Sequence, residues 1–222
     1  MDASRRQAGA SLIEVAVVVA VIGVIAAAAY PQMGVWVTNL RVKAAAREAA
    51  NTFLLARSEA IRTGTNHIVF FGPPGTTDPG GNAIEDDGGN SVPLLILSDD
   101  DADCVIDGGE ATDTVNPETN VSWGVTKATA AAPGDIGAAS YTTGSSFADI
   151  SNNAVQWVLF RPDGVPVSFT GTGGDCNTIA GTGSGGGALY VTNTNLDYAV
   201  VLTPLGGVRV HGLAAAGSNW TN

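Results

Sequence analysis

A dense acidic run could hold a divalent cation. It extends from Asp99 to Glu110 and reads Asp-Asp-Asp-Ala-Asp-Cys-Val-Ile-Asp-Gly-Gly-Glu. Calcium takes roughly six to eight hard oxygen ligands, and a calcium loop supplies them from its first, third, fifth, ninth and twelfth positions. The residues at those positions are Asp99, Asp101, Asp103, Asp107 and Glu110.

The same run also departs from a calcium loop. The sixth position, where glycine makes the sharp turn, is Cys104, and the apolar eighth position is Ile106. No helix is predicted on either side. Two interpretations therefore stay open: a calcium loop, or a solvated acidic loop whose aspartates serve β-turns.

The two cysteines add a second chemistry. Cys104 and Cys176 are far apart and form no CxxC motif. In an exported protein they would most simply make one disulfide, which would pin the acidic run to a glycine-rich segment. Two buried free thiols are the alternative.

No arrangement typical of an enzyme accompanies these groups. The chain has two histidines, His67 and His211, and lacks the HExxH and GxSxG motifs. His67 heads an apolar run, which favours an edge or core histidine with satisfied hydrogen bonds. Residues 181–186 formally fit GxGxxG, but they neither follow a predicted strand nor open a helix. We therefore predict a non-enzymatic protein without a certain cofactor, calcium being the one candidate.

The net charge of −11 is unevenly spread over the 222 residues. Residues 1–65 hold seven Lys/Arg and four Asp/Glu, whereas residues 66–222 hold three Lys/Arg and seventeen Asp/Glu. A nucleic-acid-binding surface needs a positive face toward phosphate. The acidic bulk therefore makes nucleic acid an unlikely partner.

The N-terminal region has the composition of a membrane segment. From Val15 to Leu40 no residue is charged, while Arg5 and Arg6 precede the apolar run and Arg41 follows it. About 20 residues of helix cross a bilayer core, and the early positive charges place the start of the chain in the cytoplasm. A secretory signal peptide is the ordinary alternative. Its apolar core would be only about 7–15 residues long, and it has no use for an acid such as Glu14.

The order Gly9-Ala10-Ser11-Leu12-Ile13-Glu14, followed by the Val/Ala/Ile run, resembles the class III leader of type IV prepilins and type II secretion pseudopilins. The resemblance implies cleavage by a prepilin peptidase after Gly9 and methylation of the new N-terminus, Ala10, where phenylalanine is commonest. Glu14 then becomes the fifth mature residue and Pro31 takes the place of a helix-kinking proline. Both are implied in assembly. Glu14 would pair with a neighbour's N-terminal amine, unless it only snorkels to the headgroups.

The family resemblance also implies a function and partners. It implies a structural minor pilin or pseudopilin that assembles through its N-terminal helix into a type II secretion pseudopilus or a type IV pilus. Its partners would be other pilins, the prepilin peptidase, the inner-membrane assembly platform and membrane lipid. The chain would be a single-span inner-membrane protein with a periplasmic head before it enters the filament. The alternatives are a pilin-anchored adhesin, a ligand-binding module and a DNA-capture module.

A second helical segment follows Pro31. Apolar residues recur at steps of three and four, which predicts an amphipathic helix ending near Thr63-Gly64, with glycine as its left-handed cap. This stripe is Val42, Ala46, Ala49, Phe53, Ala56 and Ala60. We expect the protein's own sheet to cover it. Residues 46–64 also resemble the equivalent helix of the H-type (GspH) pseudopilin and FimT/FimU minor pilin branch.

Beyond Thr65 the pattern changes to short β-type runs separated by turn residues. The predicted strands are His67–Phe71, Pro93–Leu97, Ala154–Phe160, Val165–Phe169, Ala188–Thr192, Tyr198–Leu202 and Val208–His211. Pro-x-Gly turns predict hairpins within 157–167 and 199–210. The predicted fold is α+β, a long N-terminal helix packed on an antiparallel β-sandwich-like head. Its predicted parts are leader 1–9, membrane and filament-core helix 10–34, amphipathic helix 35–64 and head 65–222.

Overall fold

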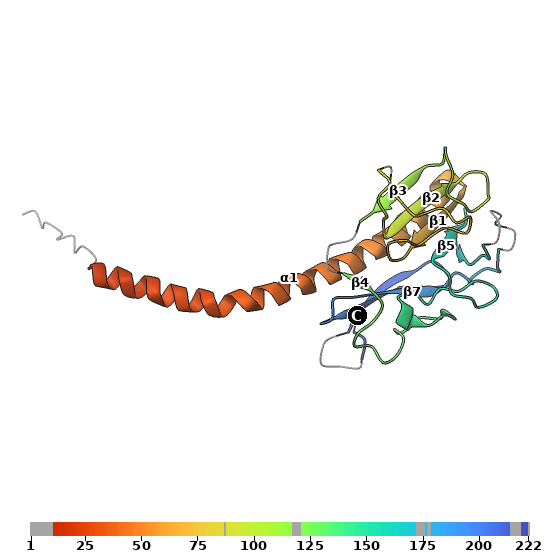
Figure 1. Cartoon of the computed structure of the whole chain (residues 1–222). Helices are drawn as coiled ribbons and strands as arrows, with labels where there is room; N and C mark the ends of the chain where they lie inside the picture. Colours follow the sequence, from red (N-terminus) through yellow and green to blue (C-terminus); the bar gives the residue numbers. More distant parts are fainter. Residues whose placement is uncertain are drawn as a thin grey trace, which may run out of the picture. The chain divides into compact units, whose positions relative to one another are not determined.

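The computed structural model describes residues 11–86, 88–116, 121–171, 176, 179–213 and 219–221, without the side chains of 28–32. The fold is α+β, as predicted: one long helix precedes antiparallel sheets (Figure 1). The chain divides into two compact units, Met1–Thr38 and Asn39–Asn222. The division into leader, membrane helix, amphipathic helix and head stays a prediction.

The first unit contains the beginning of helix α1, which extends from Leu12 to Thr63. The carbonyl of Ser11 accepts the N–H groups of Glu14 and Val15 and so closes the first turn. All side chains from Leu12 to Ala27 are exposed, although most are aliphatic. In the part of the chain that the structure describes, no helix meets the length and hydropathy needed to cross a membrane.

Within the second unit, α1 is the central element of the core. The six residues of the predicted stripe are all buried, with exposed fractions between 0% and 3%. They pack against both sheets, as expected from a stripe covered by the protein's own strands. Phe53 contacts the rings of Phe71, Phe147 and Phe160. Small alanines on this face let the helix backbone approach the strands closely.

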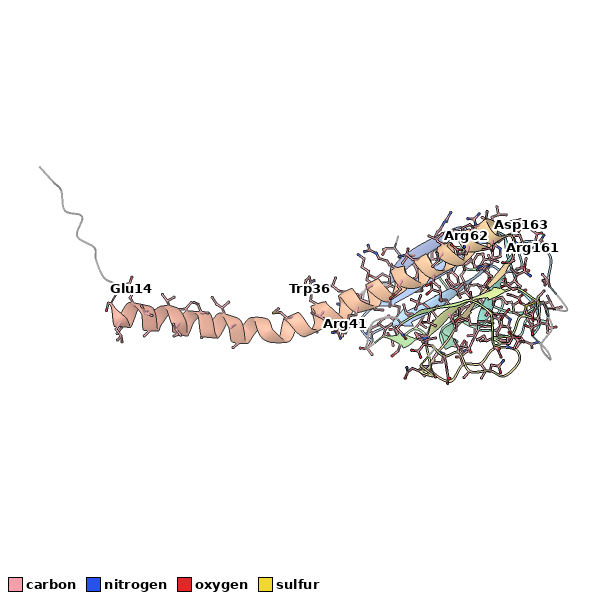
Figure 2. All side chains as sticks on the ribbon, turned by 90° about the horizontal axis from the view of Figure 1, so that it is seen from above. Glu14, Trp36, Arg41, Arg62, Arg161 and Asp163 are labelled. Carbon is pink, nitrogen blue, oxygen red and sulfur yellow. A yellow bond between two sulfur atoms is a disulfide. The ribbon has the colours of Figure 1, made fainter. Side chains whose placement is uncertain are left out.

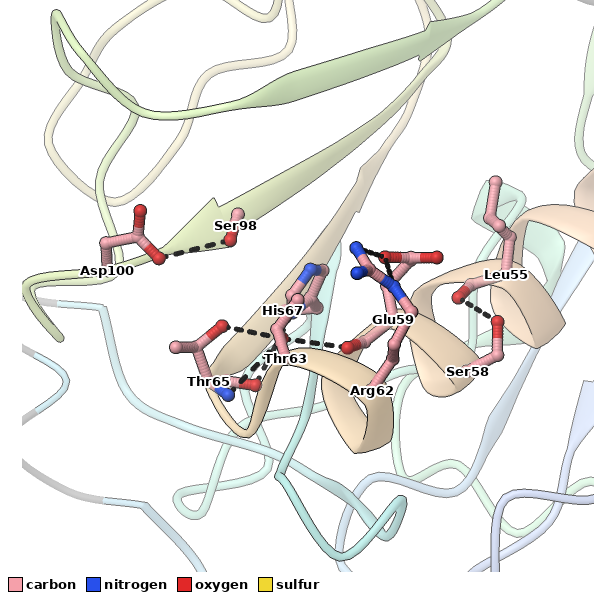
Figure 3. A network of polar contacts seen from close by, with 9 residues as sticks. All are labelled: Leu55, Ser58, Glu59, Arg62, Thr63, Thr65, His67, Ser98 and Asp100. Carbon is pink, nitrogen blue, oxygen red and sulfur yellow. Dashed lines mark hydrogen bonds and ion pairs between the residues drawn. The ribbon is translucent and has the colours of Figure 1, made fainter.

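The helix ends where the sequence predicts. Its last residue is Thr63, and Gly64 has a φ of 74°, the left-handed conformation that glycine adopts without strain. The Gly64 N–H donates to the carbonyl of Ala60. The Thr63 hydroxyl donates to the carbonyl of Glu59 and contacts the hydroxyl of Thr65, the residue that leads into the first strand (Figure 3).

Two antiparallel sheets follow the helix. The first has the strand order β3-β2-β1-β5-β6 and the second has the order β4-β7-β8-β9. The strands are β1 Asn66–Phe71, β2 Leu94–Asp99, β3 Thr112–Val115, β4 Ser122–Trp123, β5 Trp157–Phe160, β6 Pro166–Val167, β7 Gly187–Thr192, β8 Asp197–Leu202 and β9 Val208–Leu213. A 3-10 turn, η1, covers Tyr141–Thr143. The β5–β6 and β8–β9 hairpins form at the predicted Pro-x-Gly turns.

Sequence reasoning missed two strands and overestimated two others. Strands β3 and β4 were not predicted, because β3 is the polar sequence Thr-Asp-Thr-Val and β4 has only two residues. The predicted strand 154–160 begins only at Trp157, and the predicted strand 165–169 contracts to Pro166–Val167. In both cases isolated bridges, at Ala154 and Phe169, replace a continuous ladder.

Loops cover the outer faces of both sheets. Residues such as Ile84, Val92 and Cys104 pack on the outer face of the first sheet. Ala132, Tyr141 and Trp220 cover the outer face of the second. These loops are therefore structural layers that supply two further small cores.

Candidate functional site

The N-terminal residues with a predicted role all fall within the range of the first unit, Met1–Thr38. Gly9 and Ala10, the predicted cleavage and methylation positions, lie outside the described residues. Glu14 lies in the first turn of α1 with an exposed side chain (Figure 2). A carboxylate there interacts favourably with the positive end of the helix dipole. Pro31 lies within α1, whose helical backbone continues past it.

The acidic run forms the connection between β2 and β3 and brings three of its carboxylates together. Ligand atoms of Asp99, Asp101 and Asp103 all lie within 4.8 Å of one another. Asp99 Oδ1 accepts the N–H groups of Asp103 and Cys104, and Asp103 Oδ1 accepts the N–H of Val105. These carboxylates therefore fold the loop, and their remaining oxygens are what a cation could use.

Glu110 closes the same loop. Its Oε1 accepts the N–H of Asp100 at 3.1 Å, while its Oε2 is buried without a hydrogen-bond partner among the described residues. The pKa of Glu110 is raised to about 7, mainly because the carboxyl group is partly buried. Hydrogen bonds from the N–H groups of Asp100 and Asp107 lower the pKa, whereas the negative charges of Asp107 and Asp99 raise it. Burial also raises the pKa of Asp99. A nearby positive charge would stabilise the charged forms of Glu110 and Asp99.

The sixth position of the loop has the backbone conformation that a calcium loop gives to glycine. Cys104 has a φ of 62°, although it is not glycine. It is held by a disulfide to Cys176, so the acidic loop is tied to the segment that precedes β7. The two sulfurs contact Asp99 Oδ2 at 3.9 and 3.5 Å, and because bonded sulfurs carry no hydrogen these are not hydrogen bonds.

The arrangement is compatible with both interpretations of the acidic run. Three aspartates converge, but Asp99 is mainly used to hold backbone N–H groups. Calcium binding by Asp99, Asp101, Asp103, Asp107 and Glu110 stays a prediction.

Several other acids that sequence analysis did not single out have clear structural roles. Three turns repeat the pattern Asp-x-x-x-Asn, in which the aspartate accepts both the backbone N–H and the side-chain amide of the asparagine four residues later. The pairs are Asp78–Asn82, Asp86–Asn90 and Asp149–Asn153. Asp78 also accepts the N–H of Ile106 and so holds the acidic loop from outside. The repeated spacing was the signal in the sequence.

Of the two predicted places for His67, sheet edge or core, the structure has the core. His67 is 4% exposed in β1, with Nδ1 at 3.4 Å from the carbonyl of Thr65 (Figure 3). Residues 181–186 form turns between β6 and β7 rather than a nucleotide-binding strand–turn–helix.

Comparison with known families finds one match. Residues 4–30 match the prokaryotic N-terminal methylation motif. This match supports a type IV prepilin-like protein, which implies processing by a prepilin peptidase, assembly with other pilins and a location in a membrane or a pilus. Comparisons with curated proteins and with solved structures found no match.

Proposed function

We propose that the chain is a structural, non-enzymatic subunit of a type II secretion pseudopilus or a type IV pilus. The match of residues 4–30 to the methylation motif is the observation that carries this proposal. With cleavage after Gly9, Glu14 would be the fifth residue of the mature chain, which supports the proposal. The exposed aliphatic side chains from Leu12 to Ala27 give neighbouring helices a surface to pack on.

The finer assignment is a minor subunit of the GspH/FimT branch, active in priming or at the tip of a short filament. The amphipathic helix, the two hairpins and the two-sheet head support it. Before assembly the chain would be an inner-membrane protein with one span and a periplasmic head, guided to the assembly platform. The absence of charge from Val15 to Leu40 supports the membrane step.

The charge of Glu14 would be used between subunits. A carboxylate in lipid is costly unless it meets a positive partner. The free amine left at Ala10 after cleavage is such a partner on a neighbouring subunit. Pairing of the two would offset the cost of burying either charge alone.

The N-terminal mass of the mature protein tests the proposal directly. We expect wild-type protein to begin at Ala10 with a methylated amine, and Gly9→Ala to remain uncut in the membrane fraction. Gly23→Ala, a glycine with open space around its Cβ position, is the matched control and should be processed normally. A wild-type mass that is the same with and without the prepilin peptidase would refute the proposal.

A further inference from the structure

A pocket with two basic side chains lies on the helix side of the second sheet. It has a volume of about 300 Å³ and is bounded by α1, β8, β9 and the short segment that pairs with the end of β9. All of these elements lie within the second unit. The residues that line the pocket are Lys43, Arg47, Tyr198, Val210, Gly212 and Thr221.

The floor of the pocket is largely apolar and depends on a glycine. Val210 and the Tyr198 ring pack against the main core. Tyr198 and Gly212 are paired neighbours on β8 and β9, and a Cβ atom at position 212 would lie 3.1 Å from the tyrosine ring. Glycine therefore lets the ring lie close against β9. The Tyr198 hydroxyl forms no hydrogen bond with a described residue, so it is available to a ligand.

The rim of the pocket carries positive charge without a counterion. Lys43 and Arg47 are four residues apart on one face of α1, and both are exposed. Within the described part of the chain neither side chain forms an ion pair. Like charges at this spacing repel each other. An anion bound between them would reduce this repulsion.

This positive charge contrasts with the rest of the head. Residues 66–222 hold three Lys/Arg against seventeen Asp/Glu. An anionic surface therefore repels most of the head and attracts the rim of this pocket.

The pocket lies at the end of the second unit where the chain enters from the first. Asn39 is the first residue of the second unit, and its side-chain oxygen accepts a hydrogen bond from Asn193 at 3.0 Å. Asn193 lies between β7 and β8, and Tyr198 is the second residue of β8. Lys43 is about one helical turn beyond Asn39. This placement follows from contacts inside the second unit alone.

The basic residues also come directly after the uncharged run. Leu40 is the last residue of that run, and Lys43 follows it three residues later. Trp36, four residues before Leu40, is of a type enriched where hydrocarbon meets water. Lysine and arginine next to a membrane segment are attracted by anionic lipid headgroups. The sequence thus brings the pocket to the level of the headgroups.

We propose that the pocket of Lys43, Arg47 and Tyr198 binds the phosphodiester headgroup of an anionic membrane lipid of the phosphatidylglycerol type. This inference rests on the proposed function, because it requires a chain inserted in the inner membrane before assembly. The ammonium and guanidinium groups bind phosphate oxygens, and the tyrosine hydroxyl donates a further hydrogen bond. The bound lipid holds the acidic head at the membrane surface until the subunit is assembled.

The same geometry discriminates between lipids. Phosphatidylcholine has the same phosphodiester, but its quaternary ammonium would meet two like charges at the rim. The glycerol headgroup of phosphatidylglycerol is uncharged and can contact the apolar floor at Val210.

Lipid binding by the full-length chain, purified in detergent, tests the site. Native mass spectrometry should show phosphatidylglycerol bound about tenfold more tightly than phosphatidylcholine. Lys43→Gln/Arg47→Gln should abolish this preference, and Tyr198→Phe should weaken phosphatidylglycerol binding about fivefold. Arg62→Gln/Arg161→Gln removes the same net charge at the other end of the head and is the matched control, which should keep the preference (Figure 2).

The melting temperature of the wild-type chain distinguishes a lipid from a free anion. Short-chain phosphatidylglycerol should raise it, whereas inorganic phosphate at the same concentration should not. An equal rise with both would identify a free anion as the ligand and would overturn the lipid assignment.

Other outcomes would also overturn the lipid site. One is an unchanged lipid preference in Lys43→Gln/Arg47→Gln, and another is an equal loss in the matched control. If Lys43→Gln/Arg47→Gln instead lost a neighbouring subunit in a pull-down and kept its lipid preference, the pocket would bind an acidic protein. The N-terminal mass is recorded for every sample. Normal processing without a lipid preference counts against the lipid site alone, whereas absent processing counts against the proposed function.

Discussion

Arg57 donates from Nη1 to the carbonyl of Gly206 at 3.1 Å, although the two residues are 149 positions apart. Its Nε donates to the carbonyl of Gly164 at 3.0 Å. One side chain on α1 thus joins the β5–β6 turn of the first sheet to the β8–β9 turn of the second. Both turns have glycine at positive φ, which brings their carbonyls toward the guanidinium.

Replacing Arg57 with alanine should lower the free energy of unfolding by about 2 kcal/mol, since two carbonyls lose a charged donor. Arg57→Lys should recover only part of this, because an ammonium lacks the planar fork. Denaturant unfolding measures the change. Arg62→Ala, which removes an exposed ion pair with Glu59, is the control and should cost under about 0.5 kcal/mol. Equal effects at both positions would contradict the bridging role.

Asp197 should be the most sensitive carboxylate in the head. It is fully buried and accepts the N–H groups of Thr126, Lys127 and Ala128 and the hydroxyls of Thr126 and Thr192. Burial by itself would raise the pKa of Asp197, but these bonds outweigh it and hold the pKa below its usual value. Asp197→Asn should cost about 3 kcal/mol, because an amide presents a donor to donors.

The depressed pKa of Asp197 also fixes a pH dependence. In the unfolded chain the carboxyl of Asp197 has the higher pKa and binds a proton more readily. The contribution of Asp197 to the stability of the fold is therefore present above a pH of about 4 and is lost as the pH falls through the folded pKa. Thermal unfolding from pH 2 to 6 should show a loss that is smaller in Asp197→Asn, because the lowered pKa values of Asp86 and Asp149 still contribute to it. Asp163→Asn, an exposed acid, should retain the wild-type profile.

Glu110 should behave in the opposite way. Its pKa is raised from the usual 4.5 to about 7, so the stability associated with it is greatest below pH 4.5 and is lost as the pH rises toward 7. In chelator at pH 8, Glu110→Gln should therefore be more stable than wild type by about 1 kcal/mol, a figure reduced for solvent screening. An unchanged melting temperature would show that water solvates the charged Glu110 well enough for its charge not to destabilise the fold.

Calcium distinguishes the two interpretations of the same loop. If Glu110 and the three converging aspartates bind it, calcium should raise the melting temperature of wild type but not of Glu110→Gln or Asp101→Ala. Equal melting curves in calcium and chelator would leave the solvated acidic loop as the correct interpretation.

Glu14→Ala should leave cleavage after Gly9 largely intact and reduce assembly, because the peptidase and the filament use different groups. Pull-down of neighbouring subunits measures assembly, and the N-terminal mass measures cleavage. Glu59→Ala, an acid on a later turn of α1, should affect neither. Normal pull-down with Glu14→Ala would exclude the proposed pairing with a neighbour's amine.

Local patterns in the sequence predicted much of the head. The stripe from Val42 to Ala60, the glycine that ends α1 and both Pro-x-Gly hairpins depend on spacing over a few residues. Strand β3 did not follow from such a pattern, because three of its four residues are polar and none is fully buried, so it forms only by pairing with β2. Whether a short polar segment becomes an edge strand depends on the neighbouring strand that it pairs with, and not on its own residue pattern.

The roles of the acids were the harder part to predict. The acidic composition suggested a solvated loop or a calcium site. In the structure, many of the carboxylates instead accept hydrogen bonds from backbone N–H groups within turns. The Asp-x-x-x-Asn turns could have been recognised from their repeated spacing. The site at Asp197 could not, because the N–H groups of residues 126–128 reach it from about seventy positions away.

The burial of one helix face between two sheets has a mechanical consequence. From Val42 to Ala60, α1 supplies side chains to a core shared by strands of both sheets. A tensile load that enters this unit through the helix is therefore distributed over both sheets at once. Extracting the helix would require the whole domain to rupture rather than one strand to peel away.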